Sequence, residues 1–311
     1  MWRFLGKWPL ANQHIYLDYA SATPVLPEAL YALENAMRLY ANPGAIHGDG
    51  VASMRSLTDS RERIAHHLGC KARELIFTSG GTEANNLAIL GFARAIERKS
   101  PRSNLGDRGS TSVEILSSTH WIVSSIEHPS VLACFAEIER LGGRVDFVDP
   151  EPTGLIDPAK IVRALRPETV FISIGWANGE IGTMQLLSHI ARVLRTHEKN
   201  HGTSIIFHSD AGQASLYDAS NIHSLGVDIL SLDSGKLYGP RGIGCVYLND
   251  RATLAPIMLG GGQERGLRAG TENVALAAGF AEALALVARE RKEERTRLQT
   301  LRDYFARKIV T

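Results

Sequence analysis

The stretch 231-SLDSGKLYGP-240 decides how the rest of the chain is interpreted, because it holds one lysine between two apolar, strand-like segments. Those segments cover residues 227–232 and 244–248, and the stiff pair Gly239-Pro240 follows Lys236 closely. A lysine fixed in this way at the end of a strand cannot easily swing into solvent, and its most common chemistry is Schiff-base formation. The alternative is a surface lysine in a hairpin, and spacing alone does not decide between the two.

An acidic residue ends a second apolar run upstream of this lysine. Residues 205–210 read IIFHSD, so Asp210 stands at the end of a predicted strand. An imine-forming lysine and an aspartate that can pair with a pyridinium nitrogen are the two protein groups that pyridoxal phosphate requires. The plainer interpretation of Asp210 is an ordinary helix cap.

Length and composition describe a chain that can bury a large core, in one large domain or two smaller ones. It has 311 residues, of which 44% are hydrophobic, and a net charge of +1 without a basic stripe, so we expect no nucleic-acid partner. The longest apolar runs are strand-sized and the N-terminus lacks a signal-peptide core, so we expect no membrane span and a cytoplasmic protein. Cys70, Cys134 and Cys245 show neither pairing nor metal-ligand spacing, so no metal site is expected.

Strand-like and helix-like segments alternate along the middle of the chain. Strands are predicted over residues 75–78, 122–124, 145–148, 170–174 and 204–208, and helices over 27–40, 52–68, 83–96, 131–141, 158–165, 187–199 and 274–309. This alternation is typical of an α/β fold with a mainly parallel sheet covered on both faces. Residues 100–119 are rich in Ser, Arg, Gly and Asn, and we expect them to form an exposed, mobile insertion.

Three further motifs have both a functional and a structural interpretation. In 79-SGGTE-83 the glycines permit close approach of a ligand, and Thr82 either caps a helix or binds a phosphate; no Walker lysine follows, so a P-loop is not expected. His128 and Gln213 are placed to contact a flat ring at the edge of the sheet, although a lone histidine is more often structural. The segment 260-GGGQERGLRAGTEN-273 suggests a loop that approaches an anion or another chain, with Thr271 capping the last helix.

Taken together, these motifs resemble the cysteine desulfurase and selenocysteine lyase family of pyridoxal-phosphate enzymes, within the class V aminotransferase group. The resemblance implies the fold type I architecture: a large domain with a mainly parallel seven-stranded sheet over residues 31–272, and an incomplete small domain from residues 1–30 and 273–311. It also implies a homodimer with the cofactor near the subunit interface. The matching pieces run in family order: Leu17-Asp18-Tyr19-Ala20 with Thr23-Pro24, Asn42-Pro43 with His47, residues 77–86, Glu127-His128, Glu180-Ile181-Gly182, Asp210 with Gln213, and residues 236–244 and 260–271.

The resemblance also implies a role for each site residue. Lys236 would be the Schiff-base lysine, and His128 would stack on the ring and assist proton transfer. Asp210 would pair with the pyridinium nitrogen and Gln213 would contact the ring hydroxyl. The phosphate and its surroundings would be held by Gly81, Thr82, Ser234, Asn178 and, from the partner subunit, Thr271.

The chain departs from the family pattern at several positions. Gly235 replaces the histidine before the lysine, Asp233 replaces a phosphate-binding serine or threonine, and Gly179 replaces an asparagine, with Asn178 one position earlier. A carboxylate facing a phosphate would repel it, so we expect Asp233 to point elsewhere, or Ser234 to supply the lost hydroxyl through a shifted turn.

A second group of departures concerns sulfur transfer. The sulfur-accepting cysteine of the family, and a substrate-carboxylate arginine after it, would lie beyond Thr311, so the chain resembles a family member cut short. None of its three cysteines has a matching position, and Cys245 is expected to be a buried apolar residue.

The expected function is that of a pyridoxal-phosphate-dependent cysteine desulfurase. It would take sulfur from L-cysteine, leaving L-alanine and a persulfide for sulfur transfer or iron–sulfur cluster assembly, with an acceptor or scaffold protein as a possible partner. Two alternatives stay open. A class V aminotransferase or lyase acting on another amino acid needs no catalytic cysteine, and a non-catalytic truncated remnant would bind a cofactor or a partner subunit without turnover.

Overall fold

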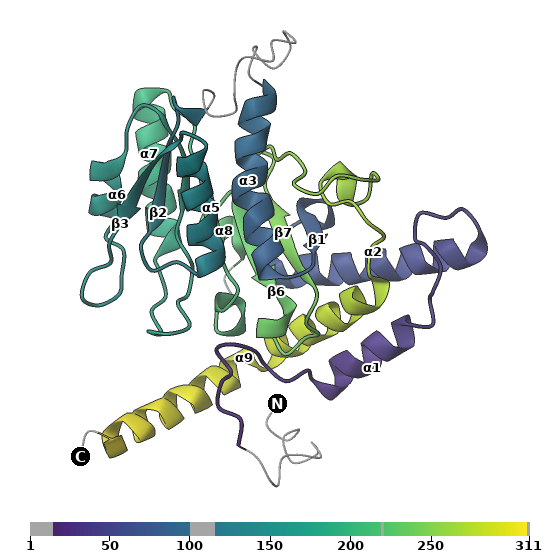
Figure 1. Cartoon of the computed structure of the whole chain (residues 1–311). Coiled ribbons are helices and arrows are strands. Elements are labelled where there is room, and N and C mark those ends of the chain that lie inside the picture. Colours follow the sequence, from purple (N-terminus) through teal and green to yellow (C-terminus); the bar gives the residue numbers. More distant parts are fainter. Residues whose placement is uncertain (1–14, 100–115, 219–220, 310–311) are drawn as a thin grey trace.

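A seven-stranded sheet lies at the centre of the computed structural model, which describes residues 15–99, 116–218 and 221–309 (Figure 1). The strand order is β1-β7-β6-β5-β4-β2-β3; β2 to β6 run parallel to one another, and β7 is antiparallel to both β1 and β6. The predicted mainly parallel sheet is therefore confirmed. The strands are β1 (Leu75–Thr78), β2 (His120–Ser124), β3 (Arg144–Val148), β4 (Thr169–Ser173), β5 (Ile206–Asp210), β6 (Ile229–Asp233) and β7 (Gly244–Leu248).

Helices cover both faces of this sheet, because alternate strand residues point to opposite sides. Trp121 of β2 packs into the apolar core beneath α3 (Gly81–Lys99) and α5 (Pro129–Arg140), whereas its neighbour Ile122 packs into the core on the other face. That second face is covered by α6 (Pro158–Ala164), α7 (Leu187–His201) and α8 (Ile222–Leu225). Short 3-10 helices occupy some connections: η2 (Ala72–Glu74), η4 (Ala214–Leu216), η5 (Ser234–Lys236) and η6 (Glu264–Gly266).

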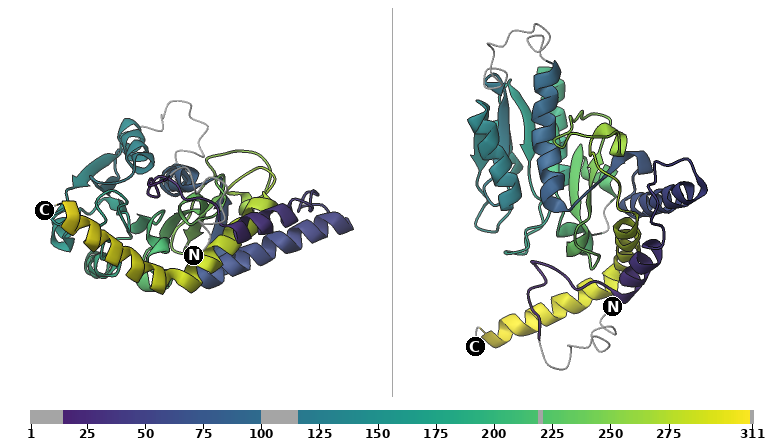
Figure 2. Two further views of the ribbon diagram at one scale, coloured as in Figure 1. Left: turned by 90° about the horizontal axis from the view of Figure 1, so that it is seen from below. Right: turned by 45° about the vertical axis from the view of Figure 1, so that its right-hand side comes forward.

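The two ends of the described chain lie side by side. Helices α1 (Pro27–Ala36) and α2 (Gly48–Leu68) both pack against α9 (Val274–Ile309), at the lower right of Figure 1, and they lie along α9 in both views of Figure 2 as well. The first half of α9 is buried through residues such as Phe280 and Leu284, whereas its second half exposes Tyr304 and Phe305. The predicted division into a large and a small domain at residues 31 and 272 stays a prediction.

Element boundaries differ from the sequence prediction at few places. Helix α1 ends at Ala36 and not at residue 40, since Met37 and Tyr40 are exposed and have no core to pack against. Helix α2 begins at Gly48, four residues early, because the His47 ring accepts a hydrogen bond from the Gly50 amide. The predicted Thr271 cap of α9 is wrong: Asn273 Oδ1 accepts the Leu276 amide at 2.9 Å.

The predicted insertion over residues 100–119 lies outside the described residues as far as residue 115. Its last four residues are described: Ser117 and Ser118 are exposed as expected, but for Leu116 and Thr119 the expected exposure is wrong. Leu116 is fully buried in the core beneath α3 and α5, and Thr119 is buried as well. An apolar side chain at the end of the segment is enough to fix that end against the sheet.

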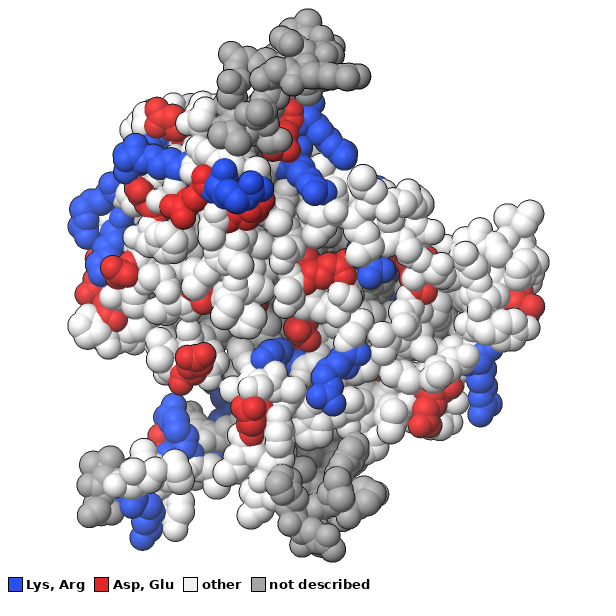
Figure 3. Space-filling view, viewed as in Figure 1, with Lys and Arg blue, Asp and Glu red and all other residues white. Residues whose placement is uncertain are grey.

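The described helices and one face of the surface (Figure 3) bear on whether a membrane or a polyanion is a partner. Within the described ranges, no helix is both long and apolar enough to cross a membrane. On the face drawn in Figure 3, basic and acidic side chains are interspersed. A mixed surface of this kind provides no extended basic stripe on that face.

Candidate active site

The carboxyl ends of β5 and β6 bring the two central residues of the prediction to one edge of the sheet. Asp210 is the last residue of β5 and pairs in register with Ser231 of β6. Lys236 follows β6 at the end of η5. In an open α/β sheet this edge is where ligands bind, so the expected convergence of Asp210 and Lys236 is supported by the topology.

A single backbone oxygen joins Lys236 to Gln213. The Lys236 ammonium donates to the carbonyl oxygens of Ala20 and Ser21, both at 2.7 Å, and Gln213 Nε2 donates to the same Ala20 oxygen at 2.6 Å. The N-terminal segment therefore lies over the lysine. Sequence reasoning placed Ala20 in a motif but did not identify it as the group that orients the amine.

Thr23 fastens this N-terminal segment to the lysine turn. Its hydroxyl donates to the Gly235 carbonyl at 2.9 Å and accepts the Tyr238 amide at 2.7 Å, and its own amide also reaches Gly235 O. The turn holds Tyr238 at a φ of 58°, a left-handed conformation that non-glycine residues rarely adopt. A buried threonine thus closes a turn whose backbone is strained at Tyr238, two residues after Lys236.

A hydrogen-bonded chain links Asp210 to His128. Asn85, 1% exposed, donates from Nδ2 to Asp210 Oδ2 at 2.7 Å and to Ser130 Oγ at 2.9 Å. Ser130 Oγ lies 2.7 Å from His128 Nδ1, which also accepts the Ser130 amide. These partners assign the free proton of the His128 ring to Nε2, on the exposed ring.

Asn85 and Ser130 were missed as functional residues by sequence reasoning. Asn85 lies inside the quoted segment 77–86 and Ser130 follows the quoted Glu127-His128 pair, but nothing in the sequence says that α3 and α5 bring them together. The only signal was their position near the starts of these two helices, each of which follows a strand.

Glu127 is a buried acid beside the site. Burial raises its pKa to about 8, and the negative charge of Asp210 acts in the same direction, so the group is largely protonated at neutral pH. Its Oε1 accepts the Gly175 amide at 2.7 Å. Glu127 therefore adds no full negative charge next to Asp210.

At the start of α3 a carboxylate occupies the place predicted for a phosphate. Asp233 Oδ2 accepts the Gly81 amide at 3.0 Å, and its Oδ1 accepts the Gly235 amide at 2.8 Å. A Cβ at Gly81 would lie 3.2 Å from Asp233 Oδ2, so the carboxylate sits closely against the helix start. The expectation that Asp233 points elsewhere is wrong, because two free amides attract its charge.

Two predicted cofactor contacts have their polar groups directed elsewhere. Ser234 is fully buried, its hydroxyl has no hydrogen-bond partner among the described residues, and it faces Gly239 within its own turn. Asn178 uses its amide for local structure: Nδ2 donates to Ile126 O, and Oδ1 accepts the amides of Glu180 and Ile181.

The glycine-rich loop is attached to the rest of the fold by its charged residues. Arg268 pairs with Glu83 of α3 at 2.9 Å, and buried Glu264 pairs with Arg61 and accepts the Phe77 amide. The Arg268 guanidinium is therefore directed at Glu83, and the expected approach of this loop to an anion or another chain stays a prediction. Thr82 and Thr271 are exposed, and the role of Thr271 toward a partner subunit stays a prediction.

None of the three cysteines offers a reactive thiolate. Burial raises the pKa of Cys70 and of Cys134 to about 12, and it raises the pKa of Cys245 as well. Because the thiolate is the nucleophile, thiols with such values react poorly at neutral pH. Cys245 lies fully buried in β7, as predicted.

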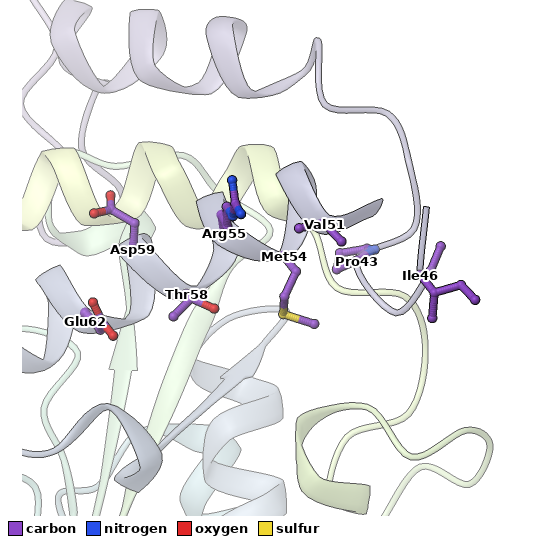
Figure 4. Close-up of a pocket in the computed structure, with 9 residues that line it drawn as sticks. Pro43, Ile46, Val51, Met54, Arg55, Thr58, Asp59 and Glu62 are labelled. Atoms are coloured by element: carbon purple, nitrogen blue, oxygen red, sulfur yellow. The ribbon is translucent and has the colours of Figure 1, made fainter. Parts of the chain in front are cut away.

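A groove of about 520 Å³ lies elsewhere on the molecule, beside the start of α2 (Figure 4). It is lined by apolar side chains such as Ile46, Val51 and Met54, with Asp59 and Glu62 farther along the helix. None of the predicted site residues lines this groove. The chemistry therefore belongs to the strand ends and not to this groove.

The strand-end lysine, the neighbouring aspartate and the mainly parallel seven-stranded sheet define a class: the fold type I pyridoxal-phosphate-dependent transferases. The family model for aminotransferase class V matches residues 15–101 and 109–310, and the gap between the two parts falls inside the predicted insertion.

Comparison with individual relatives shows to which group within this class the chain is similar. The chain is 37% identical over 299 residues to the cysteine desulfurase IscS of Dictyoglomus turgidum, which covers 96% of this chain and 70% of the relative. A solved NifS-like protein matches with a TM-score of 0.86 at 27% identity, over 96% of this chain and 76% of that one. SspA in complex with cysteine matches with a TM-score of 0.76 at 35% identity, over 88% of this chain and 72% of that one. The chain belongs to the class V aminotransferase family, in its cysteine desulfurase group, as the resemblance predicted.

Proposed function

We propose that this chain binds pyridoxal phosphate at Lys236 and withdraws sulfur from L-cysteine. The observation that carries the proposal is the position of the Lys236 amine, held by two carbonyl oxygens beside Gln213 and at the same sheet edge as Asp210. The relative solved with bound cysteine supports the choice of amino acid. A homodimer and a sulfur-accepting or scaffold protein belong to this proposal.

The residues at the ring end fit the cofactor. Lys236 would hold its aldehyde, Asp210 its ring nitrogen and Gln213 its ring hydroxyl, while the exposed ring of His128 would lie against its face. Asp210 already accepts hydrogen bonds from Asn85 and from the Gly212 amide, which fix the direction of its carboxylate. When bound, the cofactor supplies an electron sink for the negative charge that develops on the substrate Cα.

The chain's own residues would then position the substrate and move protons. Lys236 Nζ would take the proton from the Cα of cysteine, and the carbonyls of Ala20 and Ser21 would receive the hydrogen bonds of its protonated form. The Nε2 proton of His128 would be available on the exposed side of the ring, because Nδ1 is occupied by Ser130. Two protonation sites are thus held by different elements, and each has a fixed orientation.

The sulfur acceptor would be a thiol other than Cys70, Cys134 and Cys245. All three have raised pKa values because they are wholly or partly buried. Attack on the substrate sulfur requires a thiolate, so an exposed cysteine with a lower pKa must approach the site. An added small thiol would replace it in an assay.

The test is covalent capture of the cofactor. Pyridoxal phosphate added to the purified chain should produce a visible absorbance band, and borohydride should fix the label on the peptide that contains Lys236. Lys236→Ala should lose both signals, whereas the matched variant Lys199→Ala, at an exposed position on α7, should keep them. A wild-type chain without band or label would end the proposal, and alanine release from cysteine with added thiol would extend it to turnover.

A further inference from the structure

We propose that Asp233 is a built-in anion at the phosphate end of the site and that it sets cofactor specificity. Its carboxylate makes the chain bind an unphosphorylated pyridoxal-type aldehyde about as well as the phosphorylated form. This inference rests on the proposed function for the location of the site. It concerns a residue that replaces the hydroxyl expected from the family resemblance.

The first argument is the contact itself. Asp233 Oδ2 receives the Gly81 amide at the first residue of α3, and Oδ1 receives the Gly235 amide in the lysine turn. Free amides at a helix start favour an anion, and here the protein supplies that anion. A phosphate that used the Gly81 amide would have to displace a carboxylate held at both oxygens.

The second argument is charge. Among the described residues, no lysine or arginine forms an ion pair with Asp233. The stem of Arg241 lies near Gly235, where a Cβ would be 3.0 Å from its Cγ, but its guanidinium makes no ion pair with this carboxylate. A doubly charged phosphate would therefore meet a negative charge that is held by backbone amides but paired with no cationic side chain of the described residues, and the two anions would repel each other.

The third argument is that Ser234 does not replace the lost hydroxyl. Ser234, the neighbouring candidate, is fully buried and faces Gly239. Thr82 is exposed at the second residue of α3 and leaves the Gly81 amide to Asp233. The ring end of the site is independent of these groups, since Lys236, Asp210 and Gln213 bond to other partners.

One experiment uses inorganic phosphate on the chain without cofactor. Asp233→Ser and Asp233→Asn remove the charge, and Asn preserves the shape. Both variants should gain a saturable, phosphate-dependent rise in Tm that the wild type lacks. The matched control is Asp157→Asn, because Asp157 caps α6 in the same manner, through the Ala159 amide, far from the lysine turn in sequence. Equal stabilisation of the wild type and both Asp233 variants by phosphate would overturn the proposal.

A second experiment compares two aldehydes, pyridoxal and pyridoxal 5′-phosphate, by absorbance titration. The wild type should bind them with similar Kd, and Asp233→Ser should bind the phosphorylated form about tenfold or more tightly while its Kd for pyridoxal stays the same. A wild type that strongly prefers the phosphorylated aldehyde, with no change in Asp233→Ser, refutes the role of Asp233. If neither aldehyde labels Lys236 in any variant, the proposed function fails, and the phosphate arm still decides whether Asp233 excludes this anion.

Discussion

The candidate site has a ring end at Lys236 and a second end at the start of α3, and polar groups are held differently at the two. At the ring end, Lys236 is oriented by the backbone carbonyls of Ala20 and Ser21, which leave its amine free to exchange partners. At the start of α3, Asp233 saturates the amides of Gly81 and Gly235 with a charge of its own. Family membership therefore predicts where the cofactor phosphate would bind, but it does not predict whether the anion at the start of α3 comes from the ligand or from the protein.

Replacing Asp210 should have the largest effect on the ring end. Asp210→Asn keeps the size of the side chain but removes the charge that would stabilise a protonated ring nitrogen. We expect the rate of alanine formation to fall by about 10²–10³-fold, comparable to the loss of one preorganised electrostatic group. The measurement is single-turnover alanine release with an added thiol. An Asp210→Asn rate within threefold of the wild type would show that Asp210 does not act on the ring nitrogen. Asp157→Asn is the control.

The protonation of Glu127 can be measured through stability against pH. Its pKa is about 8 in the folded chain and 4.5 in the reference state, so the unfolded chain binds fewer protons between these values. The free energy of unfolding should therefore fall as pH rises from about 4.5 toward about 8, by up to about 1.4 kcal/mol per pH unit from this group.

Glu127→Gln tests this assignment, because glutamine imitates the protonated acid and does not titrate. Urea unfolding at several pH values should show a shallower slope for the variant than for the wild type. Glu180, which is exposed nearby, provides the matched variant Glu180→Gln. Parallel slopes for the wild type and Glu127→Gln would show that Glu127 is ionised in the folded chain.

The hydrogen bonds of Thr23, which fasten the N-terminal segment to the lysine turn, should contribute to the stability of the fold. Thr23→Val removes the hydroxyl that joins Gly235 O and the Tyr238 amide, and it leaves that buried amide unpaired. We expect a loss of about 1–3 kcal/mol in the free energy of unfolding. Thr23→Ser keeps the hydroxyl and should lose less, and Thr196→Val, on the exposed face of α7, should change little. Equal losses for Thr23→Val and Thr23→Ser would assign the effect to packing.

Asn85 should have the smallest effect of the four. Asn85→Ala breaks the connection between Asp210 and Ser130 without removing either group. As a positioning residue it should lower kcat about tenfold with KM nearly unchanged, and it should alter the pH profile of kcat because the hydrogen-bond support of His128 changes. Asn86→Ala, one residue along α3, is the control, since the Asn86 side chain donates to the Thr82 carbonyl oxygen of its own helix. A change in KM alone would contradict a positioning role.

Much of the fold could be read from local pattern. The run over residues 75–78 is strand β1 as predicted, and the helix predicted over residues 52–68 lies within α2, with Leu57, Ile64 and Leu68 buried. These elements follow from burial periodicity, which depends on neighbours in the chain. Two predictions failed, the end of α1 and the exposure of Leu116. Both depend on whether residues distant in the sequence form an apolar core next to these positions.

In the candidate site, too, some residues could be found from local sequence pattern, whereas others depend on contacts between distant segments. Lys236, Asp210, Gln213 and His128 were found because each follows a strand, and parallel strands end at one edge of a sheet. The roles proposed for Ser234 and Asn178 found no support in the directions of their side chains, because turn geometry aims one at Gly239 and the other at its own backbone. Asn85 was missed because its partners are 45 and 125 residues away.

The sequence by itself determined the family, the strand-end lysine and the aspartate, because these depend on residue type and local order. Only the tertiary structure decided that the Ala20 carbonyl orients the lysine and that Asp233 faces the start of α3. Both contacts join segments more than 150 residues apart, at separations of 216 and 152. The direction of a side chain across such a distance follows from packing and from the free backbone groups it meets, and no local pattern encodes either.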